Sequence, residues 1–200
     1  MTNLSMSVVN MLYNFQLMKF AGENGVAAYG TIMYVNFIFI SIYLGYSIGC
    51  APIVGYHYGA GNHGELKNLF QKSITVIVLT GILLTTSAWF LSTPLAQIFV
   101  GYDKVLFDMT RQGFRLFILS YFICGVNIFA SAFFTALNNG AVSATISFLR
   151  TLIFQVAVVL ILPIFFKING IWLAGVFAEG LSLAVSLFFF VRMKGKYHYI

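Results

Sequence analysis

Between Ile171 and Val191 the sequence reads IWLAGVFAEGLSLAVSLFFFV, an apolar run that contains a single charged residue, Glu179. A run of about 20 apolar residues is long enough to cross the hydrocarbon core of a bilayer as one helix. The run lacks the alternation of apolar and polar residues that is typical of a membrane β-barrel strand. This stretch therefore predicts a transmembrane helix with one acidic group near its middle.

Comparable apolar runs fill most of the remaining chain. Hydrocarbon cannot bond to free backbone N–H and C=O groups, so helices are the structures expected to carry these runs across a bilayer. We expect an all-α membrane protein of about six transmembrane helices, in which residues 1–200 form one lobe without a soluble domain. The expected spans are residues 5–20, 26–54, 73–91, 114–137, 141–166 and 171–191.

Composition excludes several classes of function. With 60% hydrophobic and 8% charged residues, the chain has too little polar surface for a soluble globule. Its net charge of +6 comes from lysines and arginines scattered at the ends of apolar runs, which indicates membrane anchors and not a nucleic-acid surface. No histidines or cysteines show metal-ligand spacing, and no glycine-rich phosphate loop is present. We therefore expect a multi-pass protein of the cell membrane that is not an enzyme and needs no cofactor.

Several residues predict where helices bend, pack or end. Gly45 and Gly49 have the four-residue spacing that allows close helix approach, and Pro52 is expected to bend the same span. The polar stretch 57–72 is expected to leave the membrane. Residues 92–94, Ser-Thr-Pro, are expected to break the third span, and residues 101–115 to form a short amphipathic surface helix.

Glu179 is the strongest single indication of function. An ionised carboxylate at the centre of a membrane helix costs about 2.5–3.5 kcal/mol on insertion scales, so it is expected to face a bundle interior or a water-filled cavity. Gly175, Ser182 and Ser186 lie on the same side of the helix, which indicates that this side packs against protein. We hypothesise that Glu179 binds a proton or a cation. The alternative is a static ion pair with Arg150 in the preceding, antiparallel span.

Uncharged polar groups also lie at membrane depth, where each needs a partner. They are expected either to form hydrogen bonds between helices, worth about 0.6–2 kcal/mol, or to line a substrate cavity. Asn10 and Asn14 share one helix face by their spacing. Tyr34 is a candidate for contact with aromatic cations, because ring faces attract cations, although most aromatic rings here are expected to face lipid. The candidate residues for substrate or ion binding are Glu179, Arg150, Asn10, Asn14, Asn36, Asn127, Gln155 and Tyr34.

Two motifs carry a resemblance to a known family. Residues 22–30 read GENGVAAYG, and residues 52–62 read PIVGYHYGAGN. With Asp103 after the third span and Trp172 before Glu179 in the last, they make the whole chain resemble a lobe of the multidrug and toxic compound extrusion (MATE) family. Members of this family have about twelve helices in two lobes, and this chain resembles the carboxy-terminal lobe of the bacterial subgroup.

The resemblance implies a function for an assembly. It implies antiport driven by sodium or protons that exports drugs or organic cations, with the lipid bilayer and a cationic or aromatic small molecule as partners. The chain would be a fragment, would pair with a separate amino-terminal lobe, or would pair with a second copy of itself. Two alternatives remain: a non-transporting fragment or assembly subunit, and a lipid-linked oligosaccharide flippase of the same superfamily. The cleft of such a flippase is typically richer in basic residues, and Arg150 is the only basic residue expected deep within a span. The sequence therefore favours the exporter over the flippase.

Overall fold

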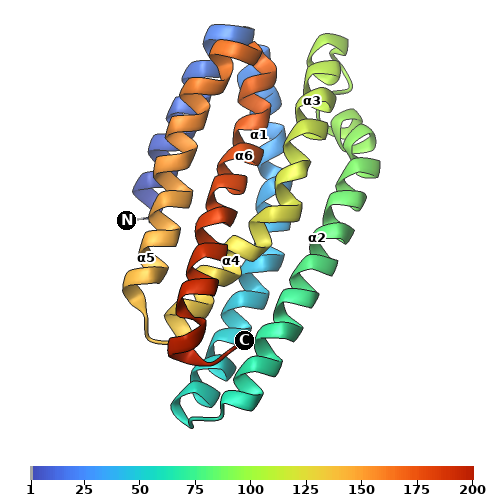
Figure 1. The fold of residues 1–200 in the computed structure, drawn as a ribbon. Helices are drawn as coiled ribbons and strands as arrows, with labels where there is room; N and C mark the ends of the chain where they lie inside the picture. The colour runs from blue at the N-terminus through green and yellow to red at the C-terminus, as the bar shows by residue number, and fades with distance from the viewer. Residues whose placement is uncertain (1) are drawn as a thin grey trace.

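The computed structural model describes residues 2–200, and nearly all of them are helical. Four continuous helical segments are long and apolar enough to cross a membrane, namely Ser5–Gly59, His63–Val100, Lys104–Ala136 and Gly140–Tyr197. No β-strand occurs within this described part, so the expected all-α class is confirmed. The elements are α1 (Thr2–Gly59), α2 (His63–Val100), α3 (Lys104–Phe117), η1 (Ile118–Ser120), α4 (Tyr121–Ala136), α5 (Gly140–Phe148), η2 (Leu149–Ile153) and α6 (Phe154–Tyr197) (Figure 1).

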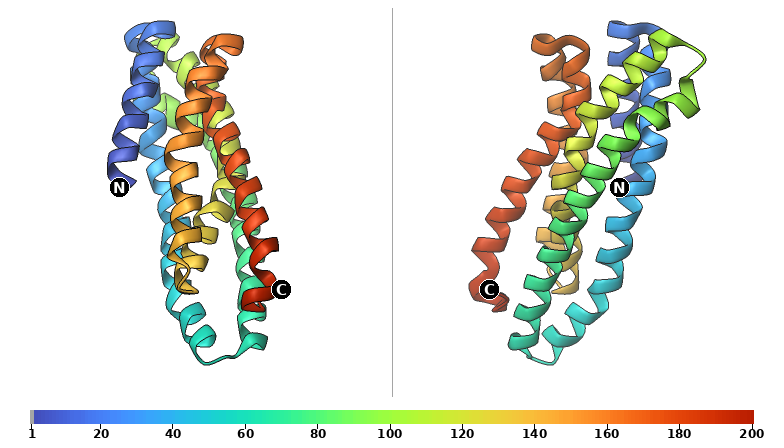
Figure 2. Two further views of the ribbon diagram at one scale, coloured as in Figure 1. Left: turned by 60° about the vertical axis from the view of Figure 1, so that its left-hand side comes forward. Right: turned by 90° about the vertical axis from the view of Figure 1, so that its right-hand side faces the viewer.

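Two of the four segments fold back on themselves at a single non-helical residue. In α1 this residue is Gly22, with φ 63° and ψ −153°, and in α6 it is Lys167, with φ 50° and ψ −131°. Figures 1 and 2 show the chain reversing direction at both places, at the same end of the bundle. Glycine suits the first position, because it has no Cβ to oppose a positive φ. The expected turns at these two places are therefore present, although the flanking helices run together without a loop.

The expected break at residues 92–94 is not an end of the helix but a change of direction within it (Figure 2). Helix α2 continues through Pro94 to Val100, and its buried side chains keep a four-residue spacing across the proline at Ala88, Ser92, Ala96 and Val100. Proline removes one backbone donor, and in membrane helices neighbouring groups compensate for that loss, so α2 changes direction near its end and still continues to Val100 (Figure 2). Helix α1 likewise continues through Pro52 to Gly59.

The expected surface helix at residues 101–115 is also wrong as a separate element. Asp103 caps α3, because its carboxylate accepts hydrogen bonds from the backbone N–H groups of Val105 and Leu106 at 2.8 and 3.1 Å. From Lys104 the chain then runs through η1 into α4 without a loop, as one helical segment that ends at Ala136. The charged residues therefore form the first turns of a long helix. The polar stretch 57–72 is similarly helical on both sides of a short turn at residues 60–62.

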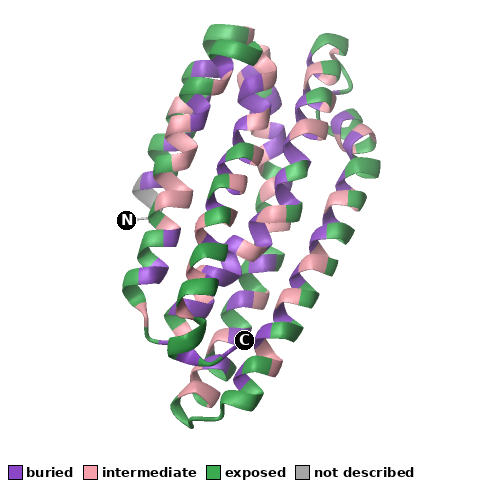
Figure 3. Ribbon diagram, in the orientation of Figure 1, coloured by how far each residue is buried: buried purple, intermediate pink, exposed green. Residues whose placement is uncertain are grey.

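The segment formed by α3, η1 and α4 is the centre of the bundle and packs against α1, α2 and α6 (Figure 3). Two of its glycines allow close helix approach. A Cβ at Gly125 would overlap the Tyr43 ring, and a Cβ at Gly113 would lie 2.8 Å from the Trp172 ring. A Cβ built at Gly45 or at Gly49 meets no atom within 4 Å among the described residues. The close approach expected at that glycine pair is therefore absent within this chain, because the two residues face outward.

The carboxy-terminal residues close one end of the bundle. Tyr199 is fully buried among the rings of Phe70, Phe133, Phe134 and Phe190, with ring centroids 4.9 to 6.4 Å from its own. Its hydroxyl donates a hydrogen bond of 2.9 Å to the backbone carbonyl of Phe190. The tail therefore joins α2, α4 and α6 through one aromatic side chain.

Replacing Tyr199 with alanine is expected to lower the free energy of unfolding by about 3–5 kcal/mol, because it removes a ring from a packed cluster and leaves a cavity. The measurement is thermal or denaturant unfolding of the purified chain in a mild detergent. Tyr102→Ala is the matched control, because Tyr102 is 85% exposed, and it is expected to change the stability by less than about 0.5 kcal/mol. Equal losses in the two variants would contradict the role assigned to the tail.

Candidate functional site

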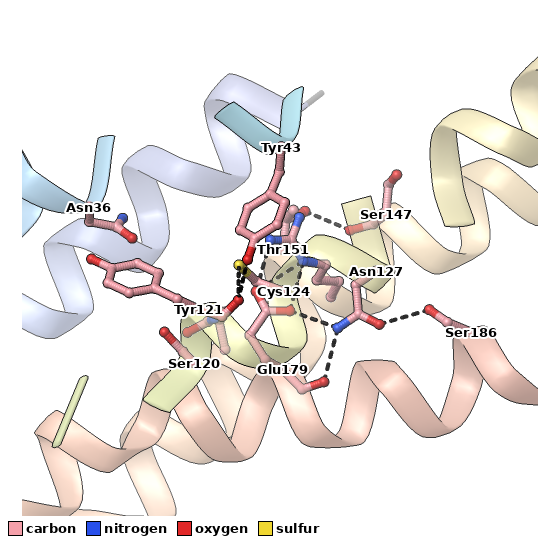
Figure 4. Close-up of polar contacts among 12 residues, drawn as sticks. Asn36, Tyr43, Ser120, Tyr121, Cys124, Asn127, Ser147, Thr151, Glu179 and Ser186 are labelled. Atoms are coloured by element: carbon pink, nitrogen blue, oxygen red, sulfur yellow. Dashed lines mark hydrogen bonds and ion pairs between the residues drawn. The ribbon is translucent and has the colours of Figure 1, made fainter. Parts of the chain in front are cut away.

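An ion pair between Arg150 of η2 and Glu179 of α6 joins these two elements, with 17% and 7% of the two side chains exposed. Figure 4 shows Glu179 with the dashed contacts made to it. The Arg150 Nε donates to both Glu179 carboxylate oxygens at 3.0 Å, and its Nη2 lies 2.8 Å from Oε1. Glu179 is only 6% exposed. This forked geometry is the strong, charge-assisted form of an arginine–carboxylate interaction. The partner predicted for Glu179 from the sequence is therefore its partner in the structure.

The arginine lies in an unusual turn of its helix. Residues Leu149–Ile153 form a π-helical turn between α5 and α6, wider than the α-helix on either side. One residue further on, the Thr151 hydroxyl donates to the Ser147 carbonyl at 2.8 Å, which satisfies a backbone acceptor in this turn. A π-turn inserts a residue into a helix, so it changes which side chains face the interior.

Asn127 holds Glu179 from the opposite side. Its Nδ2 donates to the Glu179 Oε2 at 2.7 Å and to the Glu179 backbone carbonyl at 3.0 Å. Its Oδ1 accepts a hydrogen bond of 2.9 Å from the Ser186 hydroxyl. Asn127 is fully buried on α4. We call Asn127, Arg150, Glu179 and Ser186 the Glu179 network, which connects α4, η2 and α6.

A cavity of about 360 Å³ lies beside the Glu179 network. Arg150 and Glu179 form part of its wall, so the ion pair is accessible from the cavity. Apolar and aromatic side chains form most of the rest, and a mainly apolar cavity with a few convergent polar groups is the usual form of a small-molecule site. Its lining from α1 includes Met6, Val9, Tyr13, Tyr29, Met33, Phe37, Ile40 and Leu44.

The cavity brings together five of the residues that the sequence predicts for binding, namely Asn10, Asn36, Arg150, Gln155 and Glu179. Asn127, the sixth, lies behind the cavity wall within the Glu179 network. The remaining two lie elsewhere. Asn14 is exposed and does not line the cavity, and Tyr34 is 71% exposed on the outer side of α1. Asn10 and Asn14 therefore do not act as a pair at this site.

Two tyrosines in the cavity wall were missed by sequence reasoning. The rings of Tyr13 and Tyr29 stack with centroids 5.1 Å apart. The Tyr29 hydroxyl donates to Asn10 Oδ1, and the Tyr13 hydroxyl donates to Gln155 Oε1, each at 3.0 Å. The spacing of Tyr13 three residues after Asn10 places both on one helix face, and this was the signal available in the sequence.

Comparisons with known proteins give similarity in sequence and in fold. The sequence model of the MatE family matches residues 1–161. No curated protein matches this chain in sequence. A solved structure of a multidrug resistance MATE family transporter of the MOP superfamily in its inward-facing conformation superimposes with a TM-score of 0.90 at 21% identity, over 97% of this chain and 45% of that one.

Two further solved structures match in the same way. The outward-facing conformation of a multidrug resistance MATE family transporter gives a TM-score of 0.88 at 21% identity, over 97% of this chain and 44% of that one. A MOP superfamily transporter from Pyrococcus furiosus, described as having a binding pocket of reverse polarity, gives the same four values. At this identity the matches show the fold. The chain spans less than half of the length of each of these structures.

Proposed function

The chain belongs to the MatE family of membrane transporters, and from this premise we propose that it forms one lobe of an exporter for drugs or organic cations. Export would be driven by antiport of sodium ions or protons across the cell membrane. The two reversals at Gly22 and Lys167 support a lobe with six membrane crossings, because each divides a helical segment into two antiparallel arms.

The observation that carries this proposal is the position of Glu179 in the wall of a largely apolar cavity. A buried carboxylate at membrane depth is a site where a proton or cation can replace another positive partner. In the structure that partner is Arg150, and the pair is neutral as a whole. A cation that binds Glu179 competes with Arg150, while the stacked Tyr13 and Tyr29 rings offer an aromatic wall to an organic cation.

Because the Arg150–Glu179 pair is neutral as a whole, the aromatic lining of the cavity is the feature that favours a cationic substrate over the anionic headgroup that a flippase would carry. Arg150 is the only basic residue among the described residues that line the cavity, and its hydrogen bonds go to Glu179. An anion entering the cavity would therefore have to break the ion pair to find a positive partner, which leaves Glu179 buried without compensation.

The cavity needs a second wall. Phe37, Met6 and Leu44 line it and are 75%, 51% and 43% exposed, so one side of the cavity is open within this chain. We propose that an amino-terminal lobe or a second copy of this chain covers that side. A non-transporting fragment or assembly subunit is the alternative, in which the open side packs against another membrane protein.

Liposomes containing the purified chain are expected to export ethidium faster when a sodium or proton gradient is imposed than without one. Native mass spectrometry in mild detergent, run on the same preparation, reports whether the 22.2 kDa chain forms pairs. Gradient-dependent flux from a preparation that contains pairs would support a second copy as the missing wall. Flux that ignores both gradients, or no flux, would contradict the antiporter function for this chain and favour the non-transporting alternative.

A further inference from the structure

A second, polar cavity of about 550 Å³ lies at the turn that follows Lys167, well separated in its lining from the Glu179 cavity. Residues of α3 form most of its wall, and Asn169 of α6 completes it. Gln112 Nε2 donates a hydrogen bond of 2.9 Å to Asn169 Oδ1, which joins the two helices at the cavity. The lining residues are Asp108, Arg111, Gln112, Arg115, Leu116 and Asn169.

Two arginines face this cavity from successive turns of α3. Arg111 and Arg115 are four residues apart, the spacing that places side chains on one helix face. Each guanidinium group lies over an aromatic ring, Arg111 over Phe107 at 5.6 Å and Arg115 over Trp89 at 5.4 Å. Stacking holds the flat face of a guanidinium group and leaves its edge free to donate hydrogen bonds.

The arginines carry more positive charge than the cavity neutralises. Asp108 lies 3.4 Å from Arg111, and both side chains of this pair are partly exposed. Within residues 2–200, no carboxylate forms an ion pair with Arg115. The Nε of Arg115 is buried and has no hydrogen-bond partner among the described residues. Buried donors in proteins almost always have a partner, and the charge of this guanidinium group has no counter-ion among the described residues.

We propose that this cavity binds the phosphate group of an anionic phospholipid. Guanidinium groups match phosphate oxygens with paired hydrogen bonds, and the two arginines lie close enough in sequence to bind one group together. Trp89 beside Arg115 is half exposed, and tryptophan is enriched at the headgroup level of membranes. Basic cavities between transmembrane helices are known recognition sites for acidic lipid headgroups. Leu116 adds an apolar wall to the polar one.

Native mass spectrometry of the purified chain in mild detergent tests this site, with phosphatidylglycerol and phosphatidylcholine titrated separately. We expect phosphatidylglycerol to bind more tightly, and Arg115→Gln to weaken its binding by about tenfold. Arg192→Gln is the matched control, because Arg192 also lies over a ring, Phe188 at 5.9 Å, but belongs to the last turns of α6 at the other end of that helix arm. This control is expected to leave the affinity unchanged.

Arg111→Gln is a second variant that guards against a folding defect in Arg115→Gln, because the Arg111 side chain is 39% exposed. It is expected to weaken phosphatidylglycerol binding while the chain remains monodisperse. Equal binding of the two lipids, or an equal loss in Arg192→Gln, would overturn the site and leave only general attraction between charges. Inorganic phosphate forms the last arm of the experiment. If inorganic phosphate displaces phosphatidylglycerol at equal concentration, the site binds free phosphate and not a lipid headgroup. Displacement only at large excess supports the lipid as the ligand.

Discussion

Glu179→Gln is expected to reduce gradient-driven ethidium export strongly and to destabilise the fold at the same time. The glutamine keeps the size of the side chain but leaves Arg150 charged, with only 17% of its side chain exposed, opposite a neutral group. Removing one partner of a buried ion pair costs about 3–5 kcal/mol. Loss of the carboxylate also removes the proposed ion site, so efflux should fall by about tenfold or more, which corresponds to about 1.4 kcal/mol in activation free energy.

The double variant Arg150→Gln/Glu179→Gln separates these two effects. Without either charge, the two amides can bond to each other, and we expect most of the lost stability to return, because neutral replacements of a buried pair are often tolerated. Export should not return, since the ion site is still missing. Unfolding midpoints and ethidium flux, measured on the unchanged chain, the two single variants Arg150→Gln and Glu179→Gln, and the double variant, complete the cycle.

Two outcomes would contradict the coupling role of Glu179. If the double variant regains export along with stability, the pair serves only to hold η2 against α6. If Glu179→Gln exports normally with unchanged sodium and pH dependence, the carboxylate takes no part in coupling. The stability readout remains informative even when flux is low, because unfolding in detergent does not depend on a completed transport cavity.

The ion pair could be predicted from the sequence, because the position of a residue within an apolar run indicates its depth in the membrane. Glu179 and Arg150 are charged residues inside apolar runs joined by a short turn, and antiparallel neighbouring helices bring equal depths together. Lipid cannot neutralise either charge, so a protein partner is required. Few other arrangements of these two residues satisfy that requirement, and the observed distances follow from it.

The aromatic residues of the cavity could not be chosen in the same way. A phenol ring is stable against lipid, inside a core or in a cavity wall, so its depth carries little information. Tyr34 was favoured and is exposed, whereas Tyr13 and Tyr29 line the cavity. Their roles depend on the rotation of the two arms of α1 about their axes, because Tyr13 lies before and Tyr29 after the reversal at Gly22. That rotation is set by packing against α4 and α6, which the local sequence does not specify.

The ends of the helices were predicted less well than the ion pair, for a related reason. Pro94 and the charges after Gly101 are local signals for a break and a surface helix, yet α2 continues past Pro94 after a change of direction (Figure 2), and α3 continues into α4. The cap at Asp103 illustrates the limit of such local signals. Its carboxylate marks where a helix starts but not that the helix then continues into α4. Propensity indicates where a helix can begin, whereas burial of its face decides how far it continues.

The asparagines give the clearest test of what the structure adds to the sequence, because Asn14 and Asn127 were equal candidates. Asn127→Leu keeps a similar volume but removes both donors to Glu179 and the acceptor for Ser186. We expect it to lower the free energy of unfolding by about 1–3 kcal/mol, the cost of leaving buried polar groups unpaired. Export should also change its ion dependence, because Glu179 loses one of the two groups that orient it.

Asn14→Leu makes the same chemical change at an exposed position outside the cavity, and it is expected to leave stability and ion dependence nearly unchanged. Unfolding of both variants in detergent and ethidium flux over a series of sodium concentrations provide the comparison. A larger effect at Asn14 than at Asn127 would mean that the outer side of α1 is the functional one, and would move the proposed ion site from the Glu179 network to the uncovered side. A change of ion dependence at Asn127 alone would tie the hydrogen bonds between α4 and α6 to coupling, since the two substitutions make the same chemical change and differ in burial and in contact with Glu179.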